Sequence, residues 1–417
     1  MSNNSNLLFL NNNLKTQRGQ TLLILLIILV IGGSAAFYGL VSPTASTIGR
    51  DKITAAALAQ AKDALIGYAA SDNNRPGSLP CPDLLTDNPV FNNIPNDGSA
   101  DQFSGSICPN YVGRLPWKTL GLPDLRDSNG ERLWYAVSQE FARNPSCGAS
   151  CPLNSDTPGE LTVTGTAPAD NAIAIVFSAG SAVGSQVRNG STNQNNVTNY
   201  LECGNEDGDT TYVTSAVNCT FNDKLLPITR NALMSVVEMR VLRTMRAALI
   251  AYAATPGNGY YPFANPYSDN INYECAYLQT EGRFPVKIKT LLPLPSGCSL
   301  YADWGLELPA WFSNNLWQTV SYYSVDPCKV GSVAGAGGTT TSVLNALCAL
   351  GLPPRVDGTA KDVVVLIGSS ALAAVPGQTP RPCVARSACL EAPNLSGNVF
   401  VTPTRSSTNN DRLSSVP

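Results

Sequence analysis

Ala57-Leu-Ala-Gln-Ala-Lys-Asp-Ala-Leu-Ile-Gly-Tyr-Ala-Ala70 recurs further along the chain as Val241-Leu-Arg-Thr-Met-Arg-Ala-Ala-Leu-Ile-Ala-Tyr-Ala-Ala254, with seven of the fourteen positions identical. In each copy, apolar residues follow one another at spacings of three and four, which places them on one stripe of a helix. Each segment is therefore predicted to be an amphipathic helix that packs its apolar stripe on a partner. Because the helix occurs twice, the chain is predicted to contain two copies of one folding unit.

Further matches follow the two helices in the same order. They are short motifs with fixed internal spacing: Leu133-Trp134-x-x-Val137-Ser138 with Leu316-Trp317-x-x-Val320-Ser321, Ala172–Phe177 with Val363–Gly368, Leu201-Glu202 with Leu390-Glu391, and Asn222-Asp-Lys-Leu225 with Asn410-Asp-Arg-Leu413. A common order kept over about 170 residues makes chance a poor explanation. The first match places Trp134 and Trp317 at equivalent positions, so both are predicted to lie in the core.

Behind each helix the pattern changes to short runs rich in β-branched and aromatic residues, such as Leu133–Val137, Ile173–Phe177 and Val363–Ile367. Runs of this kind, bounded by Gly, Asp and Asn, predict strands. A helix followed by several short strands predicts an α+β unit in which the helix packs on an antiparallel sheet, with disulfide-linked loops. The two predicted units are residues 61–228 and 229–417.

A hydrophobic segment precedes the first copy. No charged residue occurs between Thr21 and Val41, and about 20 apolar residues make ~30 Å of helix, which is enough to cross a bilayer. Lys15 and Arg18 precede this segment without an acidic residue, which predicts a cytoplasmic N-terminus. Residues 20–60 are therefore predicted to form a hydrophobic transmembrane and stem helix. The predicted localisation is single-pass in the inner membrane, with the bulk of the chain periplasmic or extracellular on a fibre.

Arg18-Gly19 followed by Gln20-Thr21-Leu22 and the apolar run resembles the leader of type IV prepilins and type II secretion pseudopilins. The resemblance implies that residues 1–19 are a leader, that a prepilin peptidase cuts between Gly19 and Gln20, and that the chain assembles with other pilin or pseudopilin subunits through pilin-like heads. The fifth mature residue in this family is usually Glu, whereas this chain has Ile24. The resemblance is therefore to minor subunits that lack this Glu, at the tip of a fibre or in the initiation of assembly.

Two other interpretations of the N-terminus stay open. Small residues at Ser34-Ala35-Ala36 are a weak match to the cleavage site of a secretory signal peptide. An uncut apolar run would instead anchor a periplasmic or surface binding protein of the adhesin type, which has no fibre partner.

The chain contains 12 cysteines, six in each copy, which indicates an oxidising compartment and a disulfide framework. Pairing between sequence neighbours predicts six bonds: Cys81–Cys108, Cys147–Cys151, Cys203–Cys219, Cys275–Cys298, Cys328–Cys348 and Cys383–Cys389. A zinc site is disfavoured because Cys-x-x-Cys and histidine are both absent.

Histidine is absent, which excludes Ser-His-Asp and Cys-His catalysis and removes the commonest general base. The 30 acidic residues leave an exported hydrolase with a carboxylate pair as an open alternative, although no pair is singled out. The prediction is a non-enzymatic chain without a cofactor. A net charge of −3 without a basic run predicts no nucleic-acid partner.

Asp124, Asp127, Asn129 and Glu131 are closely spaced oxygen ligands of the kind that calcium prefers. The resemblance supports this set as a candidate, because some major pseudopilins bind calcium in a loop near this place. The spacing is not that of an EF-hand loop, however, and the second copy lacks the acidic residues. The sequence therefore favours a hydrogen-bonded turn around Asn129-Gly130 over a metal site.

Overall fold

The structure is a computed structural model that describes residues 43–83, 96–215, 219–254, 259–267, 279–288, 304–305, 308–330, 348–349, 351–368, 385–404 and 409–417. The predicted cleavage residues Gly19 and Gln20, the substituted position Ile24 and the apolar run up to residue 42 lie outside these ranges. The chain divides into two compact units, Met1–Ala57 and Leu58–Pro417.

The first helix of the described part is α2 (Pro43–Ser71), and it carries the charged run Arg50-Asp51-Lys52. Nowhere in the described ranges does a helix have enough apolar length to cross a bilayer. The predicted hydrophobic helix over 20–60 is therefore wrong in its described portion, because charged side chains interrupt the apolar pattern there. The same finding contradicts the predicted single-pass membrane localisation.

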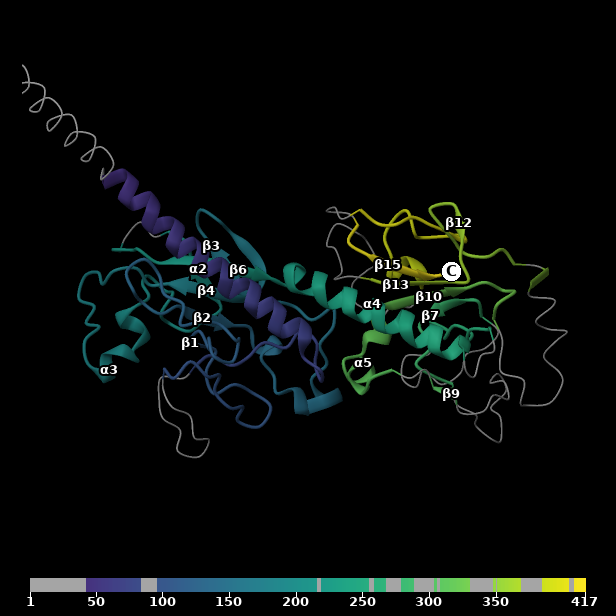
Figure 1. The fold of residues 1–417 in the computed structure, drawn as a ribbon, viewed down its shortest axis with the longest axis horizontal. Coiled ribbons are helices and arrows are strands. Elements are labelled where there is room, and N and C mark those ends of the chain that lie inside the picture. The colour runs from purple at the N-terminus through teal and green to yellow at the C-terminus, as the bar shows by residue number, and fades with distance from the viewer. Residues whose placement is uncertain are drawn as a thin grey trace, which may run out of the picture. The chain divides into compact units, whose positions relative to one another are not determined.

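The first sheet has six strands (Figure 1): β1 (Val112–Arg114), β2 (Trp134–Val137), β3 (Leu161–Thr164), β4 (Ala169–Ser178), β5 (Thr211–Val213) and β6 (Lys224–Thr229). The strands lie in the order β1-β2-β4-β3-β5, and β6 also pairs with β4. All pairings are antiparallel except that of β3 with β5, which is parallel. The long apolar strand β4 is the centre of this sheet, since its residues from Ala172 to Ser178 are all buried.

The second sheet has the strand order β15-β13-β10-β7 and is antiparallel throughout. Its strands are β7 (Glu281–Arg283), β10 (Ser321–Val325), β13 (Val363–Ile367) and β15 (Arg412–Val416). Two smaller sheets accompany it: β12 (Thr359–Ala360), β11 (Arg355–Val356) and β14 (Val399–Phe400) form one, while β8 (Lys287–Ile288) and β9 (Trp304–Gly305) form the other. The pairing of β11 with β14 is parallel.

Helix α4 (Arg230–Ala254) begins directly after β6 and contacts strands of both sheets, namely β4, β6, β13 and β15. Figure 1 shows it passing from the first sheet to the second. The shorter helices are α3 (Ser191–Gln194) and α5 (Ala310–Asn314), with 3-10 turns at η1 (Gln139–Phe141), η2 (Pro145–Ser150), η3 (Val197–Asn199), η4 (Trp317–Val320) and η5 (Arg386–Ala388).

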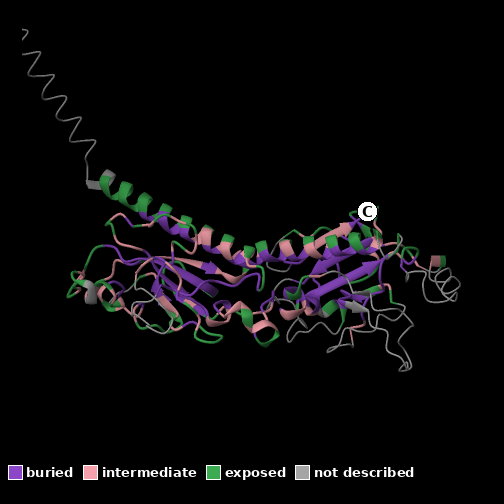
Figure 2. Cartoon of the chain, turned by 60° about the horizontal axis from the view of Figure 1, so that its bottom comes forward, coloured by how far each residue is buried: buried purple, intermediate pink, exposed green. Residues whose placement is uncertain are grey.

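The buried stripe of α4 confirms the predicted amphipathic helix. Its buried residues recur at spacings of three and four: Leu233, Met234, Val237, Glu238, Val241, Leu242, Met245, Ala248, Leu249 and Tyr252. In Figure 2 the buried side of this helix faces the strands, whereas exposed residues lie on its other side. Within α2, Leu58, Ala61, Leu65 and Ala69 form the corresponding buried stripe. Apolar burial of this kind is the main source of stability for such helices.

The two sheets share a four-strand core, β6-β4-β2-β1 in the first and β15-β13-β10-β7 in the second. The register is also shared, because pairs in the first core have counterparts in the second: Arg114–Trp134 and Trp134–Phe177 correspond to Arg283–Tyr322 and Tyr322–Leu366. The strand residue equivalent to Trp134 is therefore Tyr322. The predicted equivalence of Trp134 and Trp317 is wrong, since Trp317 begins η4 ahead of the strand. Both tryptophans are fully buried, as predicted.

The predicted fold class, two antiparallel α+β heads behind a long hydrophobic helix, is wrong. The described ranges form a mixed α/β structure with four α-helices and with parallel pairings β3–β5 and β11–β14. After the antiparallel pair β3–β4, the chain passes through α3 and η3 and then adds β5 beside β3 in the same direction. The sequence patterns did not identify β5 (Thr211–Val213), which has only three residues, so the parallel crossover was missed.

Disulfide bonds join four of the predicted pairs: Cys81–Cys108, Cys147–Cys151, Cys203–Cys219 and Cys328–Cys348. Their Cα atoms lie 5.5, 5.9, 6.3 and 4.3 Å apart, in or close to the usual range for disulfides. Cys275, Cys298 and Cys383 lie outside the described ranges, and Cys389 is disulfide-bonded. Disulfide bonding is thus confirmed in both copies of the repeat.

Candidate functional site

A pocket of about 370 Å³ opens beside the β1–β2 edge of the first sheet. Segments far apart in the sequence supply its walls: the loop before β1, the end of β1, the turn before β2, the loop after β4, and α3 with the residues behind it. The lining residues are Asn96, Arg114, Arg126, Glu131, Arg132, Arg188, Gln194 and Tyr200. Four arginines among eight residues give the pocket its character, and we refer to it as the arginine pocket.

Arg114 forms a buried part of the arginine pocket. Its guanidinium carbon lies 4.1 Å from the centroid of the Trp134 ring and 4.1 Å from that of Tyr200, so the cation is held between two aromatic rings. Nη1 donates to the backbone oxygen of Arg132 at 2.9 Å, and Nη2 to that of Gln194 at 3.1 Å. Burial lowers the pKa of Arg114 to about 10, although Tyr200 and Glu131 act in the opposite direction. The group is therefore still charged at neutral pH.

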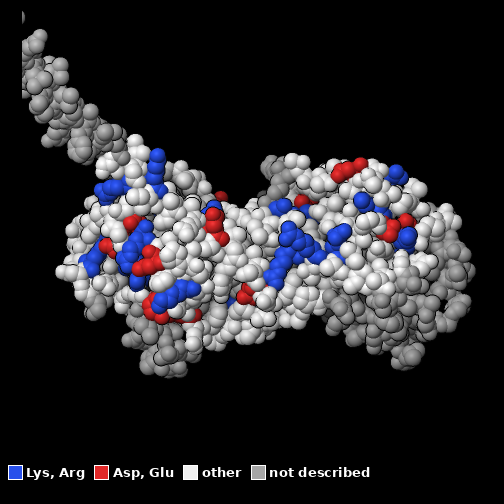
Figure 3. Space-filling model, viewed as in Figure 1, with Lys and Arg blue, Asp and Glu red and all other residues white. Residues whose placement is uncertain are grey.

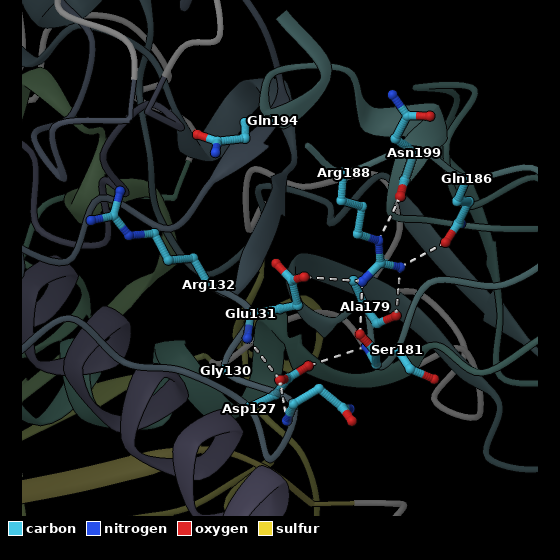
Figure 4. A network of polar contacts seen from close by, with 12 residues as sticks. Asp127, Gly130, Glu131, Arg132, Ala179, Ser181, Gln186, Arg188, Gln194 and Asn199 are labelled. Carbon is cyan, nitrogen blue, oxygen red and sulfur yellow. Dashed lines mark hydrogen bonds and ion pairs between the residues drawn. The ribbon is translucent and has the colours of Figure 1, made fainter. Parts of the chain in front are cut away.

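Arg188 is fixed from several sides (Figure 4). Its guanidinium carbon lies 4.7 Å from the centroid of the Tyr200 ring. Its nitrogens donate to four acceptors: the backbone oxygens of Asn199 at 2.8 Å, Gly180 at 2.7 Å and Ala179 at 3.2 Å, and Gln186 Oε1 at 2.7 Å. An ion pair of 3.5 Å joins Arg188 Nη1 to Glu131 Oε1. This arginine cannot reorient without breaking several bonds at once.

Arg126 and Arg132 share one carboxylate. Arg126 Nη2 lies 2.7 Å from Asp124 Oδ2, and Arg132 contacts the same carboxylate with Nε at 2.9 Å and Nη2 at 3.1 Å. Burial raises the pKa of Asp124, but the hydrogen bonds from Arg132 and Arg126 outweigh it, and the pKa is lowered overall. Arg132 Nη1 also donates to the backbone oxygen of Asn96 at 2.7 Å. Both arginines are thus positioned at the pocket while keeping part of their surface exposed.

The charges around the arginine pocket do not balance. Three of the four guanidinium groups form ion pairs with two carboxylates, Asp124 and Glu131, whereas Arg114 forms none with the residues that the structure describes. Arginine presents five N–H donors in a planar fork that matches carboxylate and phosphate oxygens. Chemically, the arrangement can bind an oxyanion, and its lining contains no nucleophile paired with a general base.

The predicted calcium ligands have other partners. Asp127 Oδ1 accepts from the backbone N–H groups of Asn129 at 2.8 Å and Glu131 at 3.0 Å, while Oδ2 accepts from Ser178 Oγ at 2.8 Å and Gly180 N at 3.1 Å. The backbone N–H of Gly130 donates to the backbone oxygen of Asp127 at 3.0 Å, which closes the turn that the sequence favoured. Asp124 and Glu131 are paired with arginines, as described above. Within the ranges that the structure covers, no group of three His, Cys, Asp or Glu residues is placed to hold a metal ion.

Two equivalent pairs of buried carboxyl groups connect a loop to the last strand of each sheet. In the first copy, Asp223 Oδ2 accepts from Glu202 N at 3.0 Å, and Glu202 Oε2 accepts from Asn222 N at 3.0 Å. Burial raises the pKa of Asp223 to about 8, against the hydrogen bond from Asn205. We call this arrangement the carboxyl clasp.

The second copy has the same carboxyl clasp. Asp411 Oδ2 accepts from Glu391 N at 2.8 Å, and Glu391 Oε2 accepts from Asn410 N at 2.9 Å. Leu-Glu and Asn-Asp are the motifs that the sequence comparison had matched between copies, although it gave them no role. Their repetition with the same atoms indicates that the clasp belongs to the scaffold of both copies.

Two residues that line the arginine pocket, in contrast, lack charged counterparts in the second copy. Because Tyr322 corresponds to Trp134, the residues two and three positions earlier correspond to Arg132 and Glu131. These are Val320 and Thr319, which carry no charge. The two copies therefore share a scaffold and differ at these two positions.

Sequence reasoning missed the arginines of the pocket. One signal was present, because Gly113-Arg114-Leu-Pro-Trp117 recurs as Gly282-Arg283-Phe-Pro-Val286. The glycine is required by packing, since a Cβ at Gly113 would lie 2.8 Å from the Asp83 backbone oxygen. The other lining arginines, Arg126, Arg132 and Arg188, are single residues in loops, which no periodicity or motif distinguishes from surface arginines.

Basic side chains also gather over α4, as Figure 3 shows. Arg240 of this helix donates to the backbone oxygens of Ala70 and Asp72, each at 2.7 Å, and Arg246 donates to that of Ser415 at 2.9 Å. These two arginines therefore bind other segments of the chain.

Comparison with protein-family models, with characterised proteins and with solved structures yields no match to this chain.

Proposed function

We propose that this chain is a non-enzymatic structural subunit of a type IV pilus or type II secretion apparatus, of the minor pilin or pseudopilin class. In this role a prepilin peptidase cuts between Gly19 and Gln20. A tip or initiating position is preferred, because Ile24 replaces the usual Glu and because a doubled head would crowd a fibre shaft.

The observation that carries this proposal is the duplication itself. Two four-strand cores with matching register, each tied by a carboxyl clasp, are joined through α4 in one compact unit. Both copies contain disulfide bonds, as expected of a protein that works in an oxidising compartment. Many of the buried charged groups described above take part in structural hydrogen bonds, which favours a scaffold over a catalyst.

One observation favours a second candidate function. The arginine pocket is typical of a ligand-binding site, so an exported binding protein without a fibre partner would also account for it. The two candidates differ in whether the protein is recovered with fibres.

The test is quantitative analysis of fibres sheared from cells that make this protein. We expect the mature chain in the fibre fraction at far below the amount of the major subunit, and fewer fibres in cells that lack the chain. Recovery at an amount comparable to the major subunit would overturn the tip or initiating position. Normal fibre numbers without the chain, together with its absence from the fibre fraction, would favour the binding protein.

A further inference from the structure

Arg114 is a buried cation for which burial outweighs the compensating charge of Glu131, a carboxylate that forms its ion pair with Arg188. Only 5% of the residue is exposed, and within the described ranges no carboxylate lies within ion-pair distance of it. Its hydrogen bonds go to two neutral backbone oxygens, and its faces are covered by the rings of Trp134 and Tyr200. A buried charge of this kind is costly unless an opposite charge compensates it, so an anion at the pocket would be stabilised there.

Donors remain at the mouth of the pocket. Arg126 makes two described hydrogen bonds and Arg132 three, whereas each guanidinium carries five N–H groups. The side chain of Arg126 is 46% exposed and that of Arg132 29%, so both can meet a ligand from solvent. The amide groups of Asn96 and Gln194 line the same space.

The site is also preorganised. Arg188 and Arg114 are held by backbone oxygens and by the Tyr200 ring between them, and Arg132 is held by Asp124. Because these side chains are already ordered, a ligand loses little free energy in fixing them. Among the lining residues, four guanidinium groups face one carboxylate, that of Glu131, so the lining carries a net positive charge.

We propose that the arginine pocket binds an oxyanion that carries two negative charges, presented by a ligand from outside the chain. Dicarboxylates and phosphate groups share this chemistry, and both match the planar fork of arginine. The volume of about 370 Å³ is sufficient for such a group with a few further atoms. The proposal does not depend on the role in fibre assembly, and it assigns the binding function to the first copy of the repeat.

Isothermal titration calorimetry of the mature chain tests the proposal, with succinate and inorganic phosphate as separate probes at an ionic strength of about 0.01 M, where charge screening is weak. We expect one saturable site for at least one of the two probes, and about tenfold weaker binding of acetate, which carries a single charge. Tighter binding of succinate would identify a carboxylate ligand, and tighter binding of phosphate a phosphoryl ligand.

Variants locate the site. Arg132→Gln is expected to weaken binding of the preferred probe by about tenfold, since it removes a charge-assisted contact. Arg126→Gln removes a more exposed guanidinium group. It replaces Arg132→Gln in the binding test if near-ultraviolet circular dichroism shows that Arg132→Gln does not fold. Arg355→Gln, an exposed arginine near the second sheet, is the matched control and should bind normally. Absence of binding by both probes, or equal binding by the pocket and control variants, would overturn the proposal.

Discussion

At the residue scale, Asp127 shows how one carboxylate can organise a site without touching a ligand. It accepts four hydrogen bonds, two within its own turn and two from the end of β4. These bonds fix the turn that carries Arg126, Glu131 and Arg132 against the loop that carries Arg188. Asp127 is therefore the residue on which the geometry of the arginine pocket depends.

We predict that Asp127→Asn lowers the free energy of unfolding by about 2 kcal/mol, because the amide group cannot accept all four bonds. Urea unfolding followed by fluorescence measures this change, and Asp209→Asn in an exposed turn should alter stability little. Added calcium should raise the melting temperature of neither the natural chain nor the variant. A calcium-dependent rise in the natural chain that Asp127→Asn abolishes would show that these residues bind the metal after all.

Asp223 gives the chain an unusual dependence of stability on pH. Its pKa is about 8 in the folded chain, against about 3.9 in an unfolded one. Between these values the folded chain holds the additional proton, so the free energy of unfolding is highest at the acidic end and falls as pH rises towards 8. Asp83, whose pKa burial raises to about 7, acts in the same direction. Histidine is absent, so no imidazole titrates in this range.

We predict that the natural chain loses stability between about pH 5 and pH 8, and that Asp223→Asn reduces this loss because the amide does not ionise. Chemical unfolding at several pH values gives the slope for each chain. Asp209→Asn is again the control and should keep the natural slope. Identical slopes in the natural chain and Asp223→Asn would contradict the raised pKa.

At the scale of elements, α4 is the helix that contacts both sheets. Its residue Glu238 is fully buried and accepts hydrogen bonds from Ser155 Oγ at 2.9 Å and from Arg412 Nε at 3.2 Å. Ser155 belongs to the first copy and Arg412 to β15 of the second sheet. A single carboxylate in this helix therefore links the two copies.

We predict that Glu238→Ala lowers the free energy of unfolding by about 3–5 kcal/mol, because it leaves the Arg412 guanidinium without its buried partner. Met239→Ala, on the exposed side of the same helix, should cost much less. Thermal unfolding of both variants provides the comparison. Equal effects of the two substitutions would show that Glu238 does not link the copies.

The disulfide loops differ in length, and their contributions should differ accordingly. Cys81–Cys108 spans 27 residues and Cys147–Cys151 only four. In the chain-entropy description, replacing the first pair by serine costs about 3–4 kcal/mol and replacing the second about 2. Urea unfolding of the two double variants measures both values. A larger loss for the short loop would contradict the entropic account.

Sequence patterns predicted the elements better than their register. Strongly periodic helices such as α4 were found because an apolar stripe at a spacing of three and four is a long signal. The shared motif Leu-Trp-x-x-Val-Ser predicts that Trp134 and Trp317 are equivalent, yet strand pairing places Tyr322 at the position of Trp134. Local similarity cannot reveal pairing, since register is decided by contacts between segments that are distant in the sequence.

At the scale of the whole molecule, the duplication was visible in the sequence but the arginine pocket was not. The clasp motifs are contiguous and recur in both copies, so comparison of the chain with itself detects them. The pocket brings together residues from Asn96 to Tyr200 that have no common spacing, and only the fold places them side by side. The parallel strand β5 was missed for a related reason, because its three residues are too few to show a strand pattern.

We propose that this chain is processed and assembled as a pilin-class subunit. The most direct measurement is the intact mass and N-terminal peptide of the protein purified from its own cells. We expect a mature chain that begins at Gln20. A chain that still begins at Met1, or one that begins after Ala36, would contradict prepilin-peptidase processing and would leave the protein as an exported binding protein with a duplicated scaffold.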